Sequence, residues 1–303
     1  MTTLPLAAGV ITEPGLYDLP EDTYHGDPVP EWSLSQSGAT KLLKPSCPAL
    51  YLHDRTHGSK PTKAMNRGTL AHALILGVGA QPVIIPDELL ASNGAASTKE
   101  ARQFKADAEA AGQIVVKADE WAEIVAMADA LRRHPVAGKL LGQDARMEQS
   151  LFWRDSIGVM RRARLDFLPD APSGRGRLIL ADYKTARSAD PSKWVKAAAD
   201  YGYHRQHANY VEGVKALGIA ADAALVFVVQ ETTAPYLVSV IELPPAAVAL
   251  GAAQMDHAAR IFANCRERNH WPDYTDGRVV SPHLPTYYVI ESEAELYEED
   301  TAA

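Results

Sequence analysis

The clearest chemical pattern in the sequence is Asp182-Tyr-Lys184, which directly follows the short apolar run 178–181. Because side chains alternate along a strand, Asp182 and Lys184 share the face that carries the preceding leucines. Asp166 lies toward the end of the preceding predicted strand, so a second carboxylate converges beside the same lysine. Two carboxylates suit a hard divalent cation, which lowers the pKa of a bound water and neutralises charge on a phosphate. Lys184 would orient that water or stabilise the developing negative charge.

Two further groups of residues extend this candidate site. Gly68 lies one helical turn before His72, so no side chain shields the imidazole on that face. Gln206 and Tyr210 share a helix face, and an amide and a phenol can hold a phosphate, a base edge or the catalytic lysine. Each pattern also has a purely structural interpretation. These are an ordinary ion pair for D-x-K, a satisfied core histidine for His72, and a wet amphipathic helix face for the Gln–Tyr pair.

The elements that position these residues follow from hydrophobic periodicity and from Gly, Pro and capping signals. Strands are expected at 149–154, 159–168, 178–181, 223–230 and 236–241, with 155–158 as a hairpin turn. Helices are expected at 66–76, 97–112, 117–134, 191–199, 203–217 and 244–268, and a short one capped by Ser33 or Ser35 ends before Pro45. This order predicts an α/β fold with a mixed central sheet flanked by helices and with extra N-terminal helices.

Composition narrows the class of protein. The 303 residues carry a formal net charge of −8 and only two cysteines, which excludes a four-cysteine zinc site or iron–sulfur cluster within this chain. No run of 18 apolar residues occurs, and the N-terminus lacks the basic region of a signal peptide, so we expect a cytoplasmic protein without membrane contact. Arginines cluster at Arg161, Arg162 and Arg164, which favours a basic cleft, although a solvated strand face would give the same pattern.

The order of these motifs carries a family resemblance. The motifs are Gly68-x-x-x-His72, Leu165-Asp166, Asp182-x-Lys184 and Gln206-x-x-x-Tyr210. They are preceded by Gly15-Leu-Tyr-Asp18, Tyr24-His25, Ser33-Leu-Ser35, Pro45-Ser-Cys-Pro48 and Lys63-Ala-Met-Asn-Arg-Gly68. The motif order resembles the RecB-like branch of the PD-(D/E)XK nucleases, and the N-terminal series resembles the nuclease domain of RecE-type exonucleases (exonuclease VIII). The resemblance covers about residues 14–290 and implies a restriction-endonuclease-like fold.

The resemblance also implies roles for individual residues. Metal ligands would be Asp166, Asp182, His72, the backbone carbonyl of Tyr183 and Glu148, and catalytic residues would be Asp166, Asp182, Lys184, His72, Gln206 and Tyr210. DNA contacts are expected from Arg161, Arg162, Arg164 and Tyr210. Leu165 stands where the name-giving motif has proline, and Pro169-Asp170 restores a literal "PD" four residues downstream. We interpret Asp170 as a decoy, because the segment 162–166 keeps the local pattern of the family.

The function implied is Mg²⁺-dependent digestion of linear double-stranded DNA from its ends, with Mn²⁺ as a substitute. The 5′-ended strand would be degraded to leave 3′ overhangs for phage-type recombination by single-strand annealing. Expected partners are a RecT-like annealing recombinase and further copies of the chain in a homo-oligomer, which could form a ring. Two alternatives stay open: an inactive nuclease fold that only binds DNA ends, and a Mg²⁺ phosphohydrolase acting on small nucleotides. The expected organisation is an N-terminal arm (1–32), a single nuclease domain (33–290) and an acidic tail (291–303).

Overall fold

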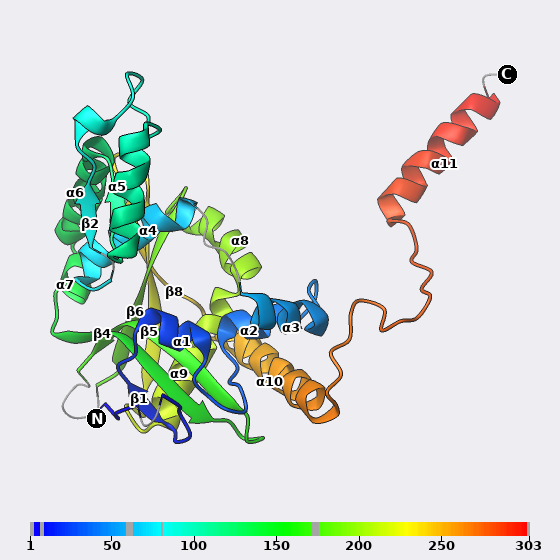
Figure 1. The fold of residues 1–303 in the computed structure, drawn as a ribbon. Helices are drawn as coiled ribbons and strands as arrows, with labels where there is room; N and C mark the ends of the chain where they lie inside the picture. The colour runs from blue at the N-terminus through cyan, green and yellow to red at the C-terminus, as the bar shows by residue number, and fades with distance from the viewer. Residues whose placement is uncertain (1–2, 7–8, 59–62, 80, 171–175, 302–303) are drawn as a thin grey trace.

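A computed structural model provides the structure of the protein. It describes the chain except residues 1–2, 7–8, 59–62, 80, 171–175 and 302–303, and it describes the backbone alone at 63–69 and 298–301. The centre is a mixed six-stranded sheet in the order β1-β4-β5-β6-β7-β8 (Figure 1). The strands are β1 (Gly15–Tyr17), β4 (Ala145–Arg154), β5 (Met160–Pro169), β6 (Leu178–Ala186), β7 (Ala223–Glu231) and β8 (Val238–Glu242). Among these six strands, as the described residues form them, β6 and β7 pair in parallel and all other neighbours are antiparallel.

Helices cover both faces of the sheet. One face packs on α8 (Pro191–Tyr201) and α9 (Tyr203–Ala216), with α10 (Pro245–Arg268) against α9. The opposite face packs on α4 (Lys63–Leu76), α6 (Ala118–Arg133) and α7 (Ala137–Leu141). These three helices form a lobe with α5 (Lys99–Ala110), the 3-10 turn η1 (Asp87–Leu89) and the parallel pair β2 (Pro82–Ile84) and β3 (Ile114–Val116) (Figure 1). The remaining helices are α1 (Glu21–Gly26), α2 (Gln36–Leu42), α3 (Pro48–His57) and α11 (Thr286–Thr301).

The alternation of side chains along β4 and β5 reverses at one level of the sheet. On β4, Leu151 packs in the cluster on the α9 side, whereas Met147 packs in the cluster on the α6 side. A regular strand would place both on one face, because they are four residues apart. On β5, Leu165 and Phe167 likewise belong to opposite clusters. Glu148, at this level of β4, has a positive φ of 56°, which is uncommon for a residue other than glycine.

Most expected elements are present in the structure. Ser35 caps α2, since its side chain accepts a hydrogen bond from the backbone N–H of Gly38. The predicted hairpin turn is stabilised by Asp155 Oδ1, which accepts hydrogen bonds from the backbone N–H groups of Ile157 and Val159. The mixed sheet flanked by helices is therefore confirmed, although β2, β3, α3 and α7 were not expected from the sequence.

The two terminal segments differ from a simple arm and tail. The segment 1–32, expected as an extended arm, contributes β1 at the sheet edge, where Leu16 is fully buried, and the short helix α1. The acidic segment 291–303 lies largely within α11, which Figure 1 shows standing apart from the body. None of the helices in the described ranges is long and apolar enough to cross a membrane.

Candidate active site

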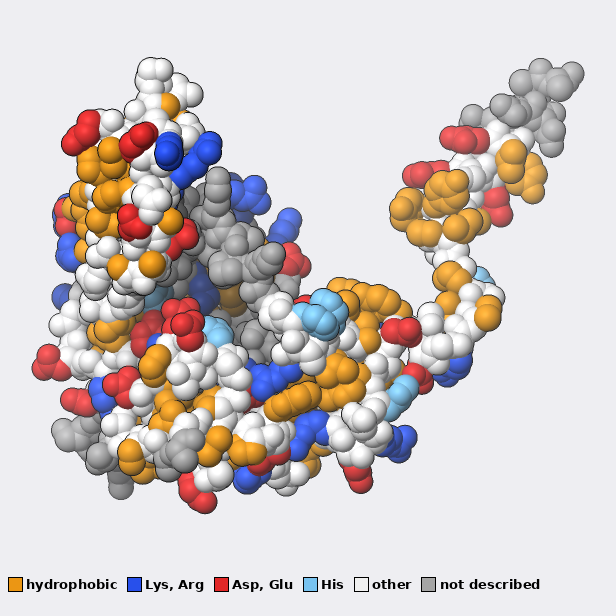
Figure 2. Space-filling view, viewed as in Figure 1, with side chains coloured by type: hydrophobic (Ala, Val, Ile, Leu, Met, Phe, Trp, Pro, Cys, Tyr) orange, Lys and Arg blue, Asp and Glu red, His pale blue; other side chains and the backbone are white. Residues whose placement is uncertain are grey.

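A cavity of about 920 Å³ opens where β4, β5 and β6 meet the lobe and the N-terminal segment. Its walls include α1, the start of α2, α4, the three strands and α9. The sequence-predicted residues that line it are His72, Glu148, Arg162, Arg164, Asp166, Tyr183, Lys184 and Tyr210. Figure 2 shows acidic and histidine side chains gathered where the lobe meets the body. The fold thus brings most of the predicted site into one hollow.

The first group in the cavity consists of one histidine and two carboxylates. His72 Nε2 lies 3.0 Å from Asp166 Oδ2, and His72 Nδ1 lies 3.4 Å from Glu148 Oε1. One ligand atom from each residue lies within 4.8 Å of the others, which is a spacing that one metal ion can bridge. Burial opposes protonation of His72, but the hydrogen bond and charge of Asp166, together with Glu148, outweigh it and raise its pKa. Two carboxylates and an imidazole fit a divalent cation such as Mg²⁺ or Mn²⁺.

The second group is the Asp182–Lys184 pair on β6. The two side chains share a strand face, and Lys184 Nζ lies 2.5 Å from Asp182 Oδ2. Gln206 Nε2 on α9 donates a hydrogen bond of 2.5 Å to Asp182 Oδ1. Burial and the charge of Asp166 raise the pKa of Asp182 to about 6, although Lys184 opposes this rise. Asp182 is only 1% exposed, so its position is fixed by these two partners.

Lys184 remains charged within this group. Burial alone would lower the pKa of its ammonium, but Asp182 and Asp166 outweigh burial and raise it. The ammonium also lies 5.3 Å from the ring centroid of Tyr203 at the start of α9, a cation–π distance. A permanently charged lysine at a phosphate site acts as an electrostatic stabiliser rather than as a base.

Tyr183, between the two charged residues of β6, joins the groups through its backbone. Its N–H donates to Asp166 Oδ2 at 3.1 Å. Its hydroxyl donates to Gln230 Oε1 at 2.7 Å, and Gln230 Nε2 in turn donates to the backbone carbonyl of Met127 at 2.8 Å. This chain of bonds ties the site to β7 and α6. The sequence carried a signal for Gln230, because it is a polar residue that ends the otherwise apolar run of β7.

Glu148 reaches the site as the resemblance implied, through the reversed part of β4. Its Oε2 accepts a hydrogen bond of 2.5 Å from Arg164 Nε, which leaves Oε1 toward His72. Arg164 Nη1 also donates to the backbone carbonyl of Leu19 at 2.8 Å. Burial and the charge of Asp166 raise the pKa of Glu148. The residue with the strained φ is thus the one whose carboxylate lines the cavity. Strained backbone conformations often occur at functional sites.

Helix α9 presents three side chains to the site at spacing i, i+3 and i+7. They are Tyr203 over Lys184, Gln206 on Asp182, and Tyr210 on the cavity wall. Burial, followed by the charges of Asp182 and Asp166, raises the pKa of Tyr210 far above its usual value, so its hydroxyl stays protonated. The predicted Gln–Tyr pair is therefore brought to the site. Tyr203 was missed, although its spacing from Gln206 and Tyr210 places it on the same helix face.

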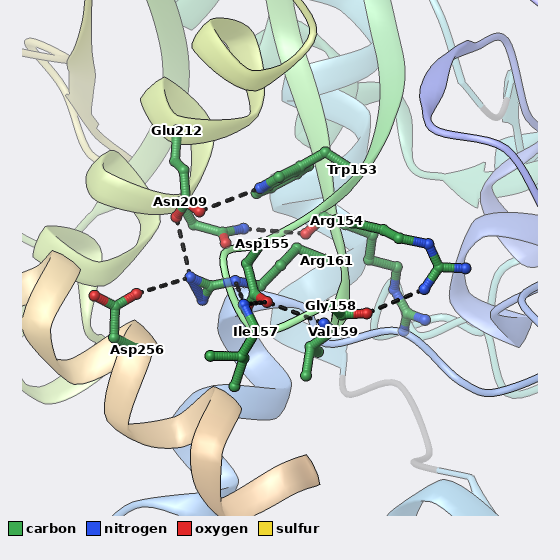
Figure 3. A network of polar contacts seen from close by, with 11 residues as sticks. Trp153, Arg154, Asp155, Ile157, Gly158, Val159, Arg161, Asn209, Glu212 and Asp256 are labelled. Atoms are coloured by element: carbon green, nitrogen blue, oxygen red, sulfur yellow. Dashed lines mark hydrogen bonds and ion pairs between the residues drawn. The ribbon is translucent and has the colours of Figure 1, made fainter.

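The three clustered arginines separate into two environments. Arg162 and Arg164 line the cavity. Arg162 Nη1 lies 2.6 Å from Asp27 Oδ2 and donates a hydrogen bond to Ser33 Oγ at 3.0 Å. Arg161 points to the opposite face of β5, where it is 0% exposed and surrounded by carboxylates (Figure 3). The expectation that Arg161 contacts DNA is therefore withdrawn, because its guanidinium has no access to the surface or to the cavity.

Two remaining sequence expectations concern Gly68 and Asp170. Asp166 lines the cavity, whereas Asp170 is exposed just after β5 and does not. This placement is consistent with the interpretation of Asp170 as a decoy. The clearance that Gly68 was expected to give His72 lies outside the described residues, since the side chains around it are not described.

Comparisons with known proteins identify the family and the fold of the chain. A family model described as a PDDEXK-like domain of unknown function (DUF3799) matches residues 35–278. A crystal structure described as "Putative exonuclease" from Eubacterium rectale is similar with a TM-score of 0.54 and 12% identity, covering 90% of this chain and 98% of that chain. At this identity the likeness shows the fold alone.

Two further comparisons give no additional support for the family or the fold. The crystal structure of SSO0001 is 12% identical over 63% of this chain and 84% of that chain, and its TM-score is only 0.27. Among curated proteins, no sequence matches the chain. The family model and the first structure together confirm the restriction-endonuclease-like fold with its mixed central sheet.

Proposed function

We propose that this chain, which belongs to the family of PDDEXK-like domains, is a metal-dependent exonuclease that degrades linear double-stranded DNA from its ends. The family assignment supports a nuclease. The observation that carries the proposal is the convergence of Asp166, Glu148 and His72 on one point beside the charged Lys184–Asp182 pair. Digestion from ends, preference for the 5′-ended strand and 3′ overhangs rest on the resemblance of the motifs to RecE-type exonucleases.

The donor set supports a divalent cation at this point. His72, Glu148 and Asp166 would hold it, with Asp182 beside them. The bound cation would supply a water of lowered pKa and neutralise charge on the scissile phosphate. We propose Mg²⁺ because carboxylate oxygens dominate the set, and Mn²⁺ as a substitute because one ligand is an imidazole.

Three residues of the chain have distinct tasks around that phosphate. Lys184, kept charged by its carboxylate neighbours, stabilises the negative charge that grows on the phosphoryl oxygens. Gln206 holds Asp182 by one oxygen, so that the other oxygen faces Lys184. Tyr210, a protonated phenol on the cavity wall, can donate a hydrogen bond to a phosphate oxygen.

The intact charged set favours catalysis over the alternative of an inactive end-binding module. A binding module has no need for a buried lysine paired with a buried aspartate next to the candidate metal ligands, since burying such a pair costs desolvation free energy. The second alternative, a phosphohydrolase of small nucleotides, shares the same metal chemistry. It is distinguished only by substrate.

The test is a digestion time course on end-labelled linear duplex DNA with Mg²⁺ or with EDTA, beside closed circular duplex. We expect linear DNA to disappear only with Mg²⁺, and circular DNA to persist. Lys184→Ala and Asp182→Ala should abolish digestion while the protein still folds, at reduced stability, and still binds DNA. Lys215→Ala, at an exposed lysine near the end of α9, should digest normally.

Three outcomes would contradict the proposal. Rapid cutting of circular DNA would indicate an endonuclease. Tight binding of ends without hydrolysis under any divalent metal would favour the inactive module. Hydrolysis of free nucleotides with no attack on DNA would favour the phosphohydrolase.

The wider context also rests on the resemblance. We propose that the protein acts in the cytoplasm as a homo-oligomer, which could close into a ring around DNA, and that it delivers 3′ overhangs to a RecT-like annealing recombinase. Light scattering on the purified chain, and co-purification with such a recombinase, test these two proposals separately. A strictly monomeric protein that digests processively would contradict the ring.

A further inference from the structure

Four aromatic rings gather at the junction of α8 and α9, next to the candidate active site. Tyr203 lies at their centre, with ring centroids 5.3 Å from Phe227, 5.5 Å from Trp194 and 5.8 Å from Tyr201. The planes of these three pairs differ by 26°, 25° and 29°, which are stacked arrangements. Phe227 and Trp194 belong to the core, whereas Tyr201 is 65% exposed. The rings thus extend from the hydrophobic core to the surface.

This aromatic group is joined to the catalytic cavity at two points. Lys184 Nζ lies 5.3 Å from the centroid of Tyr203. Gln36, which lines the cavity, donates from Nε2 to the backbone carbonyls of Tyr201 at 3.1 Å and Gly202 at 3.2 Å. Tyr201 is therefore one ring removed from the catalytic lysine.

The backbone holds Tyr201 in this place. Tyr201 ends α8, Gly202 has a φ of 72°, and Tyr203 begins α9. A side chain at Gly202 would collide with the guanidinium of Arg205 as well as strain the backbone. Arg205 is itself held by Gln254 on α10, which accepts its hydrogen bond at 2.9 Å. A large apolar ring is thus presented to solvent by a rigid joint.

Of the two tyrosines, Tyr201 has the larger ring surface left for a ligand, because Tyr203 is half-buried. Tyr203 is packed against Phe227, Trp194 and Tyr201, and its cation–π contact with Lys184 uses further ring surface. Tyr201 has one aromatic neighbour among the described residues and is 65% exposed. Tyr203 therefore acts as the positioning residue, and Tyr201 offers the free face.

We propose that Tyr201 stacks an unpaired base of the DNA strand being digested, at a nucleotide adjacent to the scissile phosphate. The inference rests on the proposed function and adds a base subsite to it. A terminal nucleotide that enters the cavity leaves the duplex stack, and an aromatic face compensates the stacking that it loses. Stacking tolerates every base, as an enzyme that removes successive nucleotides requires, whereas hydrogen-bond readout of base edges would not.

Exposed basic side chains precede Tyr201 in the chain, together with the exposed Asp190 and Asp200, and could contact the accompanying backbone. Arg187 follows β6, and Lys193 and Lys196 lie on α8, and all three are exposed. Basic side chains together with an exposed aromatic ring are the usual combination in sequence-tolerant single-strand binding. An apolar contact with another protein is the competing use of the exposed ring, and the experiment below separates the two.

The experiment measures DNA binding in the Asp166→Asn background, in which metal-dependent cleavage is expected to be lost. The probe is a fluorescent duplex with a short unpaired 5′ extension, and each extension position is replaced in turn by an abasic site. We expect Tyr201→Ala to weaken binding by about 5- to 100-fold, the loss typical of one base–aromatic stack. Tyr201→Phe should bind normally, and Tyr201→Leu should bind as weakly as Tyr201→Ala. Tyr274→Ala, which removes a tyrosine that is 69% exposed elsewhere, is the matched control and should not change binding.

The abasic series identifies stacking directly. One abasic position should weaken binding to the Tyr201 protein by the same factor as Tyr201→Ala, and should have no further effect on the Tyr201→Ala protein. Equal binding by Tyr201→Ala and Tyr274→Ala, or abasic effects that simply add to the Tyr201→Ala effect at every position, would overturn the proposal. If Tyr201→Ala folds poorly, the comparison of Tyr201→Phe with Tyr201→Leu decides in the same way.

The failure of this inference is distinguishable from failure of the proposed function. Without the Asp166→Asn change, the Tyr201→Ala protein should show a raised KM with little change in kcat, because the reacting groups are intact. If the otherwise unaltered protein does not digest linear DNA, the nuclease proposal itself is wrong. If it digests DNA and Tyr201→Ala has an unchanged KM, only the stacking subsite is wrong.

Discussion

Replacing Arg161 by methionine tests the interpretation that this arginine is structural. Its buried guanidinium lies 3.2 Å from Asp155 Oδ2 at the hairpin turn, 3.0 Å from Glu212 Oε2 on α9 and 3.2 Å from Asp256 Oδ1 on α10 (Figure 3). One side chain thus links the β4–β5 hairpin to two helices. Methionine keeps much of the volume but removes the charge, which leaves the carboxylates without their shared cation.

The expected cost follows from how buried each carboxylate is. Removing one partner of a buried ion pair costs about 3–5 kcal/mol, because the remaining charge stays desolvated. Asp256 is 57% exposed and can regain water, whereas Asp155 is 5% exposed and cannot. Asp155 still accepts two backbone hydrogen bonds, which limits its penalty. We therefore expect Arg161→Met to lower the free energy of unfolding by about 3 kcal/mol, the lower end of this range.

The assay combines urea unfolding with digestion of linear DNA on the same samples. Activity per folded molecule should be unchanged in Arg161→Met, because the guanidinium lies on the face of β5 away from the cavity. Arg154→Met is the control: Arg154 makes an exposed pair with Glu31 at 2.7 Å, so its loss should cost less than about 1 kcal/mol. A full loss of DNA binding with unchanged unfolding would refute the structural assignment of Arg161.

Two further predictions concern histidines. His72→Ala should fold with an unchanged thermal midpoint, because His72 serves the candidate metal site beside Asp166 and Glu148 rather than the core. The variant should lose most activity in Mg²⁺ and need a higher metal concentration. A lowered midpoint with a normal rate would instead identify a core histidine. His207 is buried, which lowers its pKa to about 4, so its neutral form is favoured by folding. Its contribution to stability is complete above the unfolded pKa of about 6.5 and is lost as pH falls toward the folded value, by up to about 3 kcal/mol. His207→Gln should flatten this pH dependence of unfolding between pH 6.5 and 4; an equally steep dependence in the variant would assign the effect to other groups.

The part of the site on β6 could be predicted because that strand is regular. Simple alternation places Asp182 and Lys184 on the face of Leu178 and Leu180, and the structure puts those leucines in the cluster that packs on α9. Helical spacing predicts that Gln206 and Tyr210 share a face of α9, and the family resemblance, not the spacing, assigned that face to the site, where Gln206 contacts Asp182. Where the backbone follows its ideal period, sequence pattern alone gives the residues that share a face.

The same rule, applied to β5, would have separated the arginines. Arg162, Arg164 and Asp166 have one parity and Arg161 has the other, so a strand cannot present all four to one ligand. The arginines that are neighbours in the sequence therefore lie on two opposite faces of β5. Counting positions along the strand was enough to assign Arg161 to the helix-covered side.

Other features depend on contacts that no local pattern encodes. The reversal at Glu148 requires a backbone conformation that its sequence neighbours do not indicate. The pairing of Arg162 with Asp27 joins segments that are far apart in the chain, and β1 joins the sheet by pairing with β4 from a distant part of the sequence. Such long-range contacts decide which of several plausible partners an arginine takes.

These contacts also determine the role of Arg162 and Arg164, the two arginines that line the cavity. Arg164 donates to one oxygen of Glu148, and the other oxygen is directed at His72 and the candidate metal position. Arg162 is likewise engaged by Asp27 and Ser33. Neither guanidinium is held ready for a phosphate; each instead fixes a wall of the cavity. In the proposed nuclease, the positive charge beside the scissile phosphate would therefore come from Lys184 and the divalent cation rather than from these two arginines.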